Sequence, residues 1–463
     1  MSEKTTRTLL GRTTLYTYEP AINESNILSV VSDSLTAHSV NASDIEYLWK
    51  YYKGKQPILN REKKIRKEIN NKIVENHASE IVAFFSGYLL GEPCTYVRRG
   101  KDESVSEKIN MLNEMMFSED KASCDKELAT WLYVCGVGYR MGLSDATMLS
   151  EDSPFEIYTC DPRSTFVIRS SALGQEIMVG VQIVTQPDDS LLYCGYTKTH
   201  YFETDLQDLK TWEPHSYGIV PIFEYSANTA KMGAFEPVIG LLDAINTVMS
   251  NRVDGVEQFV QSLMVLYNAD IDDQAAENLR AYGLITLKST GDIKADLKIL
   301  NEELDQSQTQ TLVDHMIDTV KAIVGMPSNT KGLGGGASGN MGSVLAWQGW
   351  DICEDRVNET ELLFKKTEKQ FLRLVLNIIR DTRGITLKLS DIDIKFSRRN
   401  IENLLVKTQA LTNLLNSGVK PEVAIATIGL WNDPMDVAAQ SAEYLKKWDV
   451  GNVQKQGGDK TLA

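Results

Sequence analysis

The sequence predicts an α+β fold that is mainly α, and two observations lead to this prediction. The second half of the 463-residue chain has long stretches with apolar residues at steps of three and four, a spacing typical of helices with one buried face. Short segments bounded by turn residues lie between residues 155 and 225 and indicate strands. A glycine-rich loop, residues 326–342, lies between two of the predicted helices.

Composition and charge exclude some classes of protein. With 42% hydrophobic and 24% charged residues, the chain is an ordinary globular protein, long enough for two to four domains. The formal net charge of −15 disfavours a protein that grips DNA by neutralising phosphates, but it suits a wall past which DNA slides. The first ten residues are polar, and the longest nearly apolar run, residues 81–91, is too short to span a bilayer. We therefore expect a soluble protein that is not exported.

We predict no metal site, no cofactor and no disulfide framework. The six cysteines lack the CxxC spacing and nearby histidines of zinc sites, and they fit a reduced cytoplasm. The five histidines lie too far apart in sequence to suggest a shared site. These residues are Cys94, Cys124, Cys135, Cys160, Cys194 and Cys353, and His38, His77, His200, His215 and His315.

In the first half of the chain, helices are expected to precede a group of strands. Ser43 or Asp44 is the predicted N-cap of the second helix, and Asp161-Pro162 is a predicted turn. The predicted helices are residues 27–35, 43–54, 71–90 and 121–139, and the predicted strands are residues 155–160, 166–169, 177–185, 191–197 and 219–225.

The second half is predicted to begin with a long helix, residues 235–267, whose apolar seam needs a partner helix. A small module follows, with strands at 284–287 and 297–300. Helices are predicted on both sides of the glycine-rich loop, and the helix after the loop is expected to have a kink near Gly349. Strands at 385–389 and 392–396 are expected to rejoin the earlier sheet. The remaining predicted helices are residues 308–324, 343–381, 401–416, 421–428 and 434–448.

The glycine-rich loop also allows three enzyme interpretations, each of which lacks a required feature. Residues 334–339 match the dinucleotide fingerprint GxGxxG, but the preceding residues 311–324 have helical spacing where the fingerprint needs a strand. Lys331 precedes the glycines, whereas the lysine of a P-loop follows them. Asn340 stands where a Gly-x-Ser-x-Gly elbow has its last glycine. We therefore predict no catalytic residue.

Several blocks of residues form a recognisable set. They are Tyr51 to Gly54, Asn71 to Pro93, Asp161-Pro162-Arg163, Gly218 to Ile222, Asp243 to Asn246, Ser250 to Asp254, and Gly325-Met326-Pro327 followed by the glycine-rich loop with Ala337-Ser338-Gly339. The set resembles the portal (connector) proteins of tailed double-stranded DNA bacteriophages, most closely the long-tailed type from phages of Gram-positive bacteria. The likeness runs from about Trp49 to Trp448. One departure is Ser338-Gly339-Asn340-Met341, where the family usually has Ser-Gly-x-Ala-Leu.

The resemblance implies a portal fold assembled as a ring, with a mixed α/β wing, a long-helix stem, a small α/β clip and a helical crown. It assigns residues 1–40 to an N-terminal arm, 41–233 to the wing, 234–267 to the first stem helix, 268–303 to the clip, 304–325 to the second stem helix, 326–342 to the tunnel loop, 343–399 to a long kinked helix with returning wing strands, 400–450 to the crown and 451–463 to a disordered tail.

The resemblance also implies a function. Portal proteins of this kind form a ring, here expected to have twelve subunits, at one vertex of the phage head. Double-stranded DNA is packaged through the ring without sequence specificity and is later ejected through it. The implied partners are the large terminase subunit, a head-completion (adaptor) protein, the major capsid protein and a scaffolding protein, with no membrane. The expected location is the virion, and the host cytoplasm during assembly.

Two sets of site residues follow from this assignment. The residues expected to face DNA in the tunnel loop are Lys331, Gly332, Gly334, Gly335, Gly336, Ser338, Gly339 and Asn340. The residues expected to contact the terminase and the adaptor at the clip are Asp270, Asp272, Asp273, Glu277, Arg280, Lys288, Asp292 and Lys294. The polar groups at both places are also compatible with simple solvation.

Two other classes of protein remain open from the sequence. One is a helical scaffold or adaptor unrelated to phages, in which the long helices form a bundle. The other is an enzyme with a nucleotide site at the glycine-rich loop, which the missing strand disfavours. A mass near twelve subunits favours the ring over the bundle, and saturable ATP or NAD binding would favour the enzyme.

Overall fold

The computed structural model describes residues 11–64, 67–100, 104–144, 153–260, 263–267, 296–300, 306–327, 350–396, 404–431 and 434–445. The chain divides into two compact units: residues 1–53, 78–236 and 325–463 form unit 1, and residues 54–77 and 237–324 form unit 2. Helices outweigh strands among the described residues, which confirms the predicted α+β, mainly α class.

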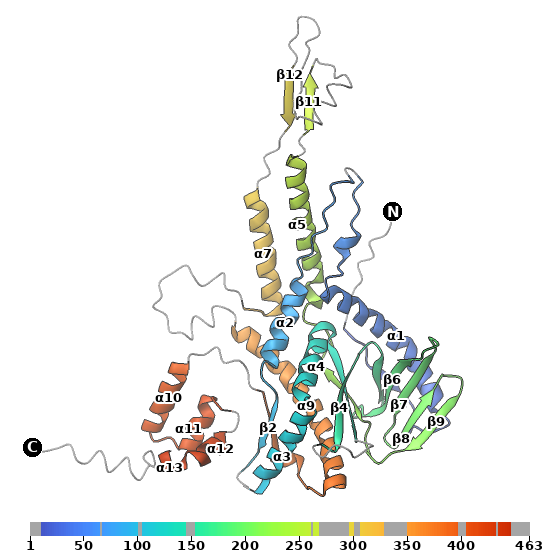
Figure 1. Ribbon diagram of the computed structural model, residues 1–463, viewed down its shortest axis with the longest axis vertical. Coiled ribbons are helices and arrows are strands. Elements are labelled where there is room, and N and C mark those ends of the chain that lie inside the picture. Colours follow the sequence, from blue (N-terminus) through green and yellow to red (C-terminus); the bar gives the residue numbers. More distant parts are fainter. Residues whose placement is uncertain are drawn as a thin grey trace, which may run out of the picture. The chain divides into compact units, whose positions relative to one another are not determined.

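Unit 1 contains a six-stranded sheet with the strand order β1-β5-β6-β7-β8-β9 (Figure 1). β1 pairs with β5 in parallel, and the other neighbours are antiparallel. Helix α1 (Ile27–Tyr52) packs on this sheet through Ile27, Val30 and Val31, which share a buried core with Phe166 and Phe202. The strands are β1 (Leu15–Thr17), β5 (Thr165–Ser170), β6 (Ile177–Thr185), β7 (Leu191–Tyr196), β8 (His200–Thr204) and β9 (Leu209–Pro214).

A second sheet of unit 1 has the order β10-β3-β4, and helices α4 (Lys121–Cys135) and α9 (Trp350–Arg383) pack against it. Its strands are β3 (Val137–Ser144), β4 (Phe155–Cys160) and β10 (Ile222–Ser226). Gly136 joins α4 to β3 with a φ of +83°, and an added Cβ would lie 2.2 Å from the carbonyl oxygen of Lys231. Only glycine fits this turn, so the helix expected to continue to residue 139 ends at Cys135.

The rest of unit 1 is mostly helical. Strands β2 (Thr95–Arg98) and β13 (Ile392–Lys395) form a two-stranded antiparallel sheet. The helices are α2 (His77–Leu89), α3 (Ser104–Ser118), α10 (Leu404–Asn416), α11 (Pro421–Ile428), α12 (Pro434–Gln440) and α13 (Ala442–Leu445), and a 3₁₀ turn, η4, covers Leu389–Asp391. From α10 to α13, each helix packs on the next.

Unit 2 is built on two helices, α5 (Ile239–Val260) and α7 (Gln306–Val324), which pack side by side (Figure 1). The 3₁₀ turn η2 (Glu236–Val238) precedes α5, and η1 (Pro57–Asn60) packs on α5. Strands β11 (Leu263–Tyr267) and β12 (Asp296–Leu300) form an antiparallel pair. The remaining segment of the unit, residues 67–76, has no helix and runs along α5.

The prediction of a helix break before residue 43 was wrong, because α1 is continuous from Ile27 to Tyr52. Polar residues on its buried face hide the helical period. His38 places its ring Nε2 3.1 Å from the carbonyl oxygen of Arg163, and Asn41 bonds to both backbone groups of Thr13. Ser43 and Asp44 therefore lie inside the helix and do not cap it.

Several other expectations about boundaries were wrong. The helix expected from Asn71 begins only at His77, and the helix expected to continue to Tyr267 gives way to strand β11. Residues 385–388 are not a strand, because Ile385 and Leu387 pack against α3 and α9 instead. β13 pairs with β2 and not with the larger sheets. The kink expected near Gly349 lies outside the described residues.

Most of the predicted strands are confirmed. Residues 155–160 and 177–185 form strands with the predicted bounds, and residues 421–428 form a helix with the predicted bounds. The turn at Asp161 is closed by a bond from the Ser164 amide to the Asp161 carbonyl at 3.1 Å. Strands β1, β2, β8 and β9 were missed.

Candidate functional site

The structure does not describe the predicted site residues, but it describes the backbone on either side of them. The tunnel-loop set (Lys331, Gly332, Gly334, Gly335, Gly336, Ser338, Gly339, Asn340) and the clip set (Asp270, Asp272, Asp273, Glu277, Arg280, Lys288, Asp292, Lys294) lie outside the described residues. The described flanks are Gly325–Pro327 and Trp350 for the first set, and β11 and β12 for the second.

The clip segment leaves and returns at one place. Leu263 pairs with Leu300, and Tyr267 pairs with Asp296, so the two ends of residues 268–295 are neighbouring strand ends. The sequence predicted the strand at 297–300 but paired it with residues 284–287. The run Leu-Met-Val-Leu-Tyr at 263–267 was taken as the end of a helix because its apolar residues fit either period.

The tunnel-loop segment is preceded by Gly325, which has a φ of +74°. An added Cβ there would lie 2.6 Å from Cδ of Arg356 and 3.3 Å from Cγ2 of Ile352, both on α9. Gly325 is therefore required for the turn and for its close approach to α9.

A polar stripe on α5 holds the extended segment of unit 2. Asn246, Ser250 and Asp254 are spaced four residues apart and are almost fully buried, at 0%, 0% and 3% exposure. Their side-chain oxygens accept the backbone N–H groups of Glu75, Ile73 and Asn71 at 2.8, 2.9 and 2.7 Å. We call this set of three bonds the α5 ladder.

The three bonds of the α5 ladder can form together because the repeat distance along the helix matches the repeat distance along the extended segment. Four residues of an α-helix rise about 6 Å, and two residues of an extended chain rise about 6.6 Å. Every second amide of residues 71–75 therefore meets every fourth side chain of α5, with the two chains running in opposite directions. A helix at residues 71–76 would turn these amides inward, which is why the helix begins only at His77.

Asp254 adds charge to one end of the ladder. Its Oδ2 lies 2.9 Å from Nη1 of Arg61 and 2.5 Å from Nζ of Lys63, and its Oδ1 also accepts a bond from the Asn71 amide side chain at 3.0 Å. Burial alone would raise the pKa of Asp254, but the bonds from Lys63 and Asn71 outweigh it and hold the pKa below its usual value.

The ladder joins three blocks that the sequence singled out separately. Asn71 and Ile73 belong to the block ending at Pro93, whereas Asn246, Ser250 and Asp254 belong to the two blocks on the long helix. Their contact could not be predicted from the apolar seam of α5, which was the pattern used for this helix. Polar residues repeating at four-residue steps on a helix are the signal that could have revealed it.

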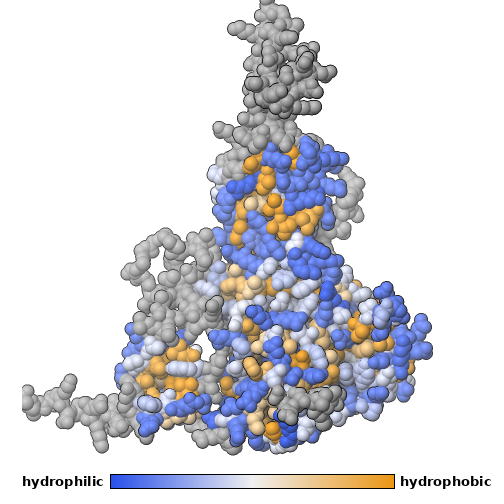
Figure 2. All heavy atoms as spheres, viewed as in Figure 1, coloured by the Kyte–Doolittle hydropathy of each residue, from blue (hydrophilic) through white to orange (hydrophobic). Residues whose placement is uncertain are grey.

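Part of the predicted seam of unit 2 is exposed. Leu242 and Ile245 are buried, but Val256 is 50% exposed, and on α7 Leu312 is 49% exposed. Figure 2 shows apolar residues gathered on the surface of this helix pair. A soluble chain seldom exposes a group of apolar side chains without a partner to cover it.

A buried charge cluster connects the elements of unit 1. Nη1 of Arg140 and Oε2 of Glu368 are 2.8 Å apart, and Nζ of Lys121 lies 2.6 Å from Asp125 Oδ2 and 3.1 Å from Glu368 Oε1. Arg140 also pairs with Asp125. None of these four side chains is more than 4% exposed. The cluster is balanced in charge and closed to solvent, so it holds the fold together and offers no substrate access.

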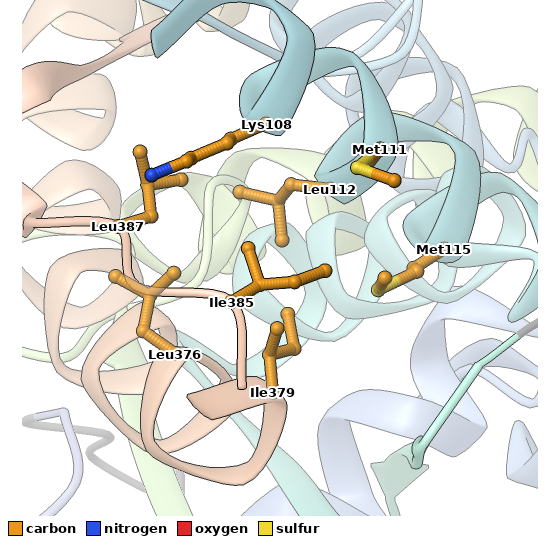
Figure 3. Close-up of a pocket in the computed structure, with 8 residues that line it drawn as sticks. All are labelled: Lys108, Met111, Leu112, Met115, Leu376, Ile379, Ile385 and Leu387. Carbon is orange, nitrogen blue, oxygen red and sulfur yellow. The ribbon is translucent and has the colours of Figure 1, made fainter. Parts of the chain in front are cut away.

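The cavity in Figure 3 is not a ligand site. It has a volume of about 10 Å³, lies between α3, α9 and residues 385–387, and is lined by aliphatic and methionine side chains together with the chain of Lys108. This volume holds at most one water molecule, and water needs polar partners. In the part of the chain that the structure describes, no group of acidic, histidine or cysteine residues could hold a metal ion. None of the described helices combines the length and hydropathy needed to cross a membrane.

Comparison with known proteins identifies the family. The family described as "Phage portal protein, SPP1 Gp6-like" matches residues 32–449, which is most of the chain. The chain belongs to this phage portal family. It is 22% identical over 404 residues to the portal protein of Bacillus phage SPP1, covering 81% of this chain and 77% of that protein.

A solved structure gives a weaker likeness. A chain from "Neck of empty GTA particle computed with C6 symmetry" is 11% identical, with a TM-score of 0.45 over 76% of this chain and 90% of its own length. This TM-score is too low to support an argument about the fold. The family match thus confirms the resemblance to portals of phages of Gram-positive bacteria, and the protein is a phage portal protein and a component of the virion.

Proposed function

We propose that this portal protein forms a ring-shaped channel at one vertex of the phage head, through which double-stranded DNA is packaged by the terminase motor and later ejected. The observation that carries the proposal is the family match across residues 32–449. The acidic balance of the chain, −15, supports a conduit because tight phosphate contacts would resist the movement of DNA.

The proposal assigns roles to the two segments that leave and return at one place. Residues 326–342 are the tunnel loop, with Lys331 and Asn340 as its DNA-facing polar groups, and residues 268–303 are the clip that contacts the terminase and the adaptor. The antiparallel pairing of β11 with β12 supports a module with its own base at the clip. The capsid and scaffolding proteins are proposed to contact the wing, and assembly is proposed to occur in the host cytoplasm.

The first experiment is electron microscopy of the purified protein combined with its mass in solution. We expect rings with a central hole and about twelve subunits. Compact single copies without a hole would refute the channel.

The second experiment deletes Lys331 to Gly339. The deletion is expected to leave rings intact and to reduce the DNA packaged into heads in which this variant is the only portal protein. Loss of ring assembly would show that the segment is needed for the fold of the ring and not for DNA passage.

The proposal also holds that the ring has no enzymatic activity and binds no cofactor. The glycine-rich loop lacks the strand and the lysine position of nucleotide sites, and the buried charges of unit 1 saturate one another. Calorimetric titration of the ring with ATP and with NAD is expected to show no saturable binding.

A further inference from the structure

The start of α9 is held on two opposite sides. Trp350 and Glu354 lie one turn apart, and Ile352 and Arg356 form a second pair one turn apart. Since each residue of a helix turns by about 100°, the two pairs lie on opposite faces. The first pair contacts α2 and the second contacts Gly325.

On the first face, three aromatic rings pack together. The Trp350 ring lies 6.0 Å from the Phe84 ring and 5.7 Å from the Tyr88 ring, measured between centroids. Phe84 and Tyr88 are stacked, with their centroids 6.1 Å apart. The Tyr88 hydroxyl donates a hydrogen bond of 2.7 Å to Oε2 of Glu354. We call Phe84, Tyr88, Trp350 and Glu354 the α2–α9 clamp.

The clamp is tied to the core of unit 1. Phe85, the neighbour of Phe84, is only 3% exposed and stacks on Tyr133 of α4 at 5.5 Å. The rings of Phe84 and Phe85 also meet edge to face at 5.2 Å. The aromatic side of α2 therefore gives α9 a fixed support at its first turn.

On the second face, Gly325 lies against the same two turns. Its close approach to Arg356 and Ile352 places the backbone before residues 328–349 beside the helix that follows them. Whatever conformation that segment takes, its two described ends are held on one short stretch of α9. The first turns of α9 thus lie between Phe84 and Tyr88 on one side and Gly325 on the other. We call this arrangement the base, and none of its contacts involves residues 328–349.

We propose that Phe84, Tyr88 and Trp350 are positioning residues for DNA passage, which fix the described backbone on either side of the proposed tunnel loop. This inference rests on the proposed function of the loop. The contacts of the clamp and of Gly325 all lie within one subunit, so they hold the first turns of α9 without help from a neighbour. Loosening the clamp is expected to free the first turns of α9, and with them the described backbone that flanks residues 328–349.

The test measures the hydrogen-exchange rates of α9 amides in purified rings. Trp350→Ala removes the central ring of the clamp and is expected to raise the exchange rates of the α9 amides at residues 354–358 about tenfold. Tyr88→Phe keeps the ring and removes the hydroxyl that donates to Glu354, and it is expected to raise these exchange rates about fivefold. Amides at residues 371–379 are expected to keep their rates.

Trp431→Ala is the matched control, because Trp431 is 41% exposed and lies outside the clamp. It is expected to change neither set of amides. Unchanged exchange at residues 354–358 in Tyr88→Phe would overturn the clamp, even if Trp350→Ala failed to fold.

A second measurement links the clamp to function. Heads assembled with Tyr88→Phe or Trp350→Ala as the only portal protein are expected to contain less packaged DNA than heads with Trp431→Ala. Faster exchange with normal packaging would overturn the positioning role. If the proposed function itself is wrong, the deletion of Lys331 to Gly339 will also leave packaging unaffected. This result distinguishes failure of the proposed function from failure of the clamp alone.

Discussion

Glu368 shows how single residues organise unit 1. Its carboxylate lies against Arg140 and Lys121, and it accepts hydrogen bonds from the hydroxyls of Tyr96 and Tyr225 at 2.6 and 2.5 Å. Burial would raise its pKa, but the two cations and the two hydroxyls lower it to about 2. Glu368 thus connects α9 to α4, β2, β3 and β10.

We predict that Glu368→Gln lowers the free energy of unfolding by about 3 kcal/mol, because it leaves the two buried charges of Arg140 and Lys121 with Asp125 as their one acidic partner in the cluster. Urea unfolding at neutral pH measures the change. Glu359→Gln, on the exposed side of the same helix, is the control and should stay within about 0.5 kcal/mol of the wild type. A loss as small as that of the control would mean that Asp125 alone balances the two cations.

His38 makes the stability of unit 1 depend on pH, in a range where few other groups titrate. Burial lowers its pKa from 6.5 to about 4, against the opposing effect of its bond to the Arg163 carbonyl. The unfolded chain therefore binds a proton below pH 6.5 that the folded chain refuses, so stability falls as the pH falls. Between pH 7.5 and 5 the loss should be about 2 kcal/mol.

The check is to repeat urea unfolding across this pH range with His38→Gln, which keeps a donor near the Arg163 carbonyl. The variant should lose about 2 kcal/mol less than the wild type between pH 7.5 and 5. Equal slopes for the two proteins would show that folding does not lower the pKa of His38.

At the scale of elements, the sequence predicted those parts whose pattern is local. The strands at 155–160 and 177–185 have apolar runs bounded by turn residues, and the helix at 421–428 is bounded by Pro421 and Gly429. The errors came where long-range contacts replace the local pattern. In α1 the polar side chains of His38 and Asn41 face the interior because the backbone of Arg163 and Thr13 satisfies them.

The α5 ladder is the second such case, and it makes a prediction. Ser250→Ala removes the acceptor of the Ile73 amide, and a buried amide without a partner costs about 1–3 kcal/mol. We expect faster hydrogen exchange in the peptide covering residues 70–76. Thr247→Ala is the control, because Thr247 is exposed on the same helix and bonds to the Asp243 carbonyl.

Only the exchange of the extended segment should change in Ser250→Ala, since Asn246 and Asp254 still hold its two ends. Exchange as slow as in Thr247→Ala would show that the bond to Ser250 contributes nothing to holding the segment. Faster exchange throughout α5 would show instead that Ser250 stabilises the helix itself.

At the scale of the whole molecule, the family could be recognised from the sequence because its blocks are contiguous in the chain. The site could not be built in the same way. Glycine repeats such as Gly334-Gly335-Gly336 predict a loop but not its geometry, because glycine accepts many backbone conformations. Phe84 and Tyr88 lie in the block from Asn71 to Pro93, but the sequence does not pair them with Trp350, and only their contacts reveal the clamp.

Ring assembly should depend on the exposed apolar side chains of the α5–α7 pair. Val253, Val256, Leu312 and Ile323 are 37%, 50%, 49% and 40% exposed. A ring closes only when each subunit covers a surface of its neighbour, and apolar side chains supply the favourable free energy of that contact. Leu312→Lys places a charge in this surface, so each subunit contact should weaken about tenfold if roughly 1.4 kcal/mol of burial is lost, and the fraction of protein in rings should fall at least as much because every contact of the ring is affected.

Leu173→Lys is the matched control. Leu173 is fully exposed at the tip of the loop between β5 and β6, and it belongs to no group of apolar side chains on α5 or α7. Mass photometry gives the fraction in rings, and circular dichroism verifies that both variants are folded. A lysine buried in a subunit contact without a paired acidic group is strongly unfavourable. If folded Leu312→Lys protein forms rings as well as Leu173→Lys protein does, the α5–α7 surface is therefore not part of the subunit contact.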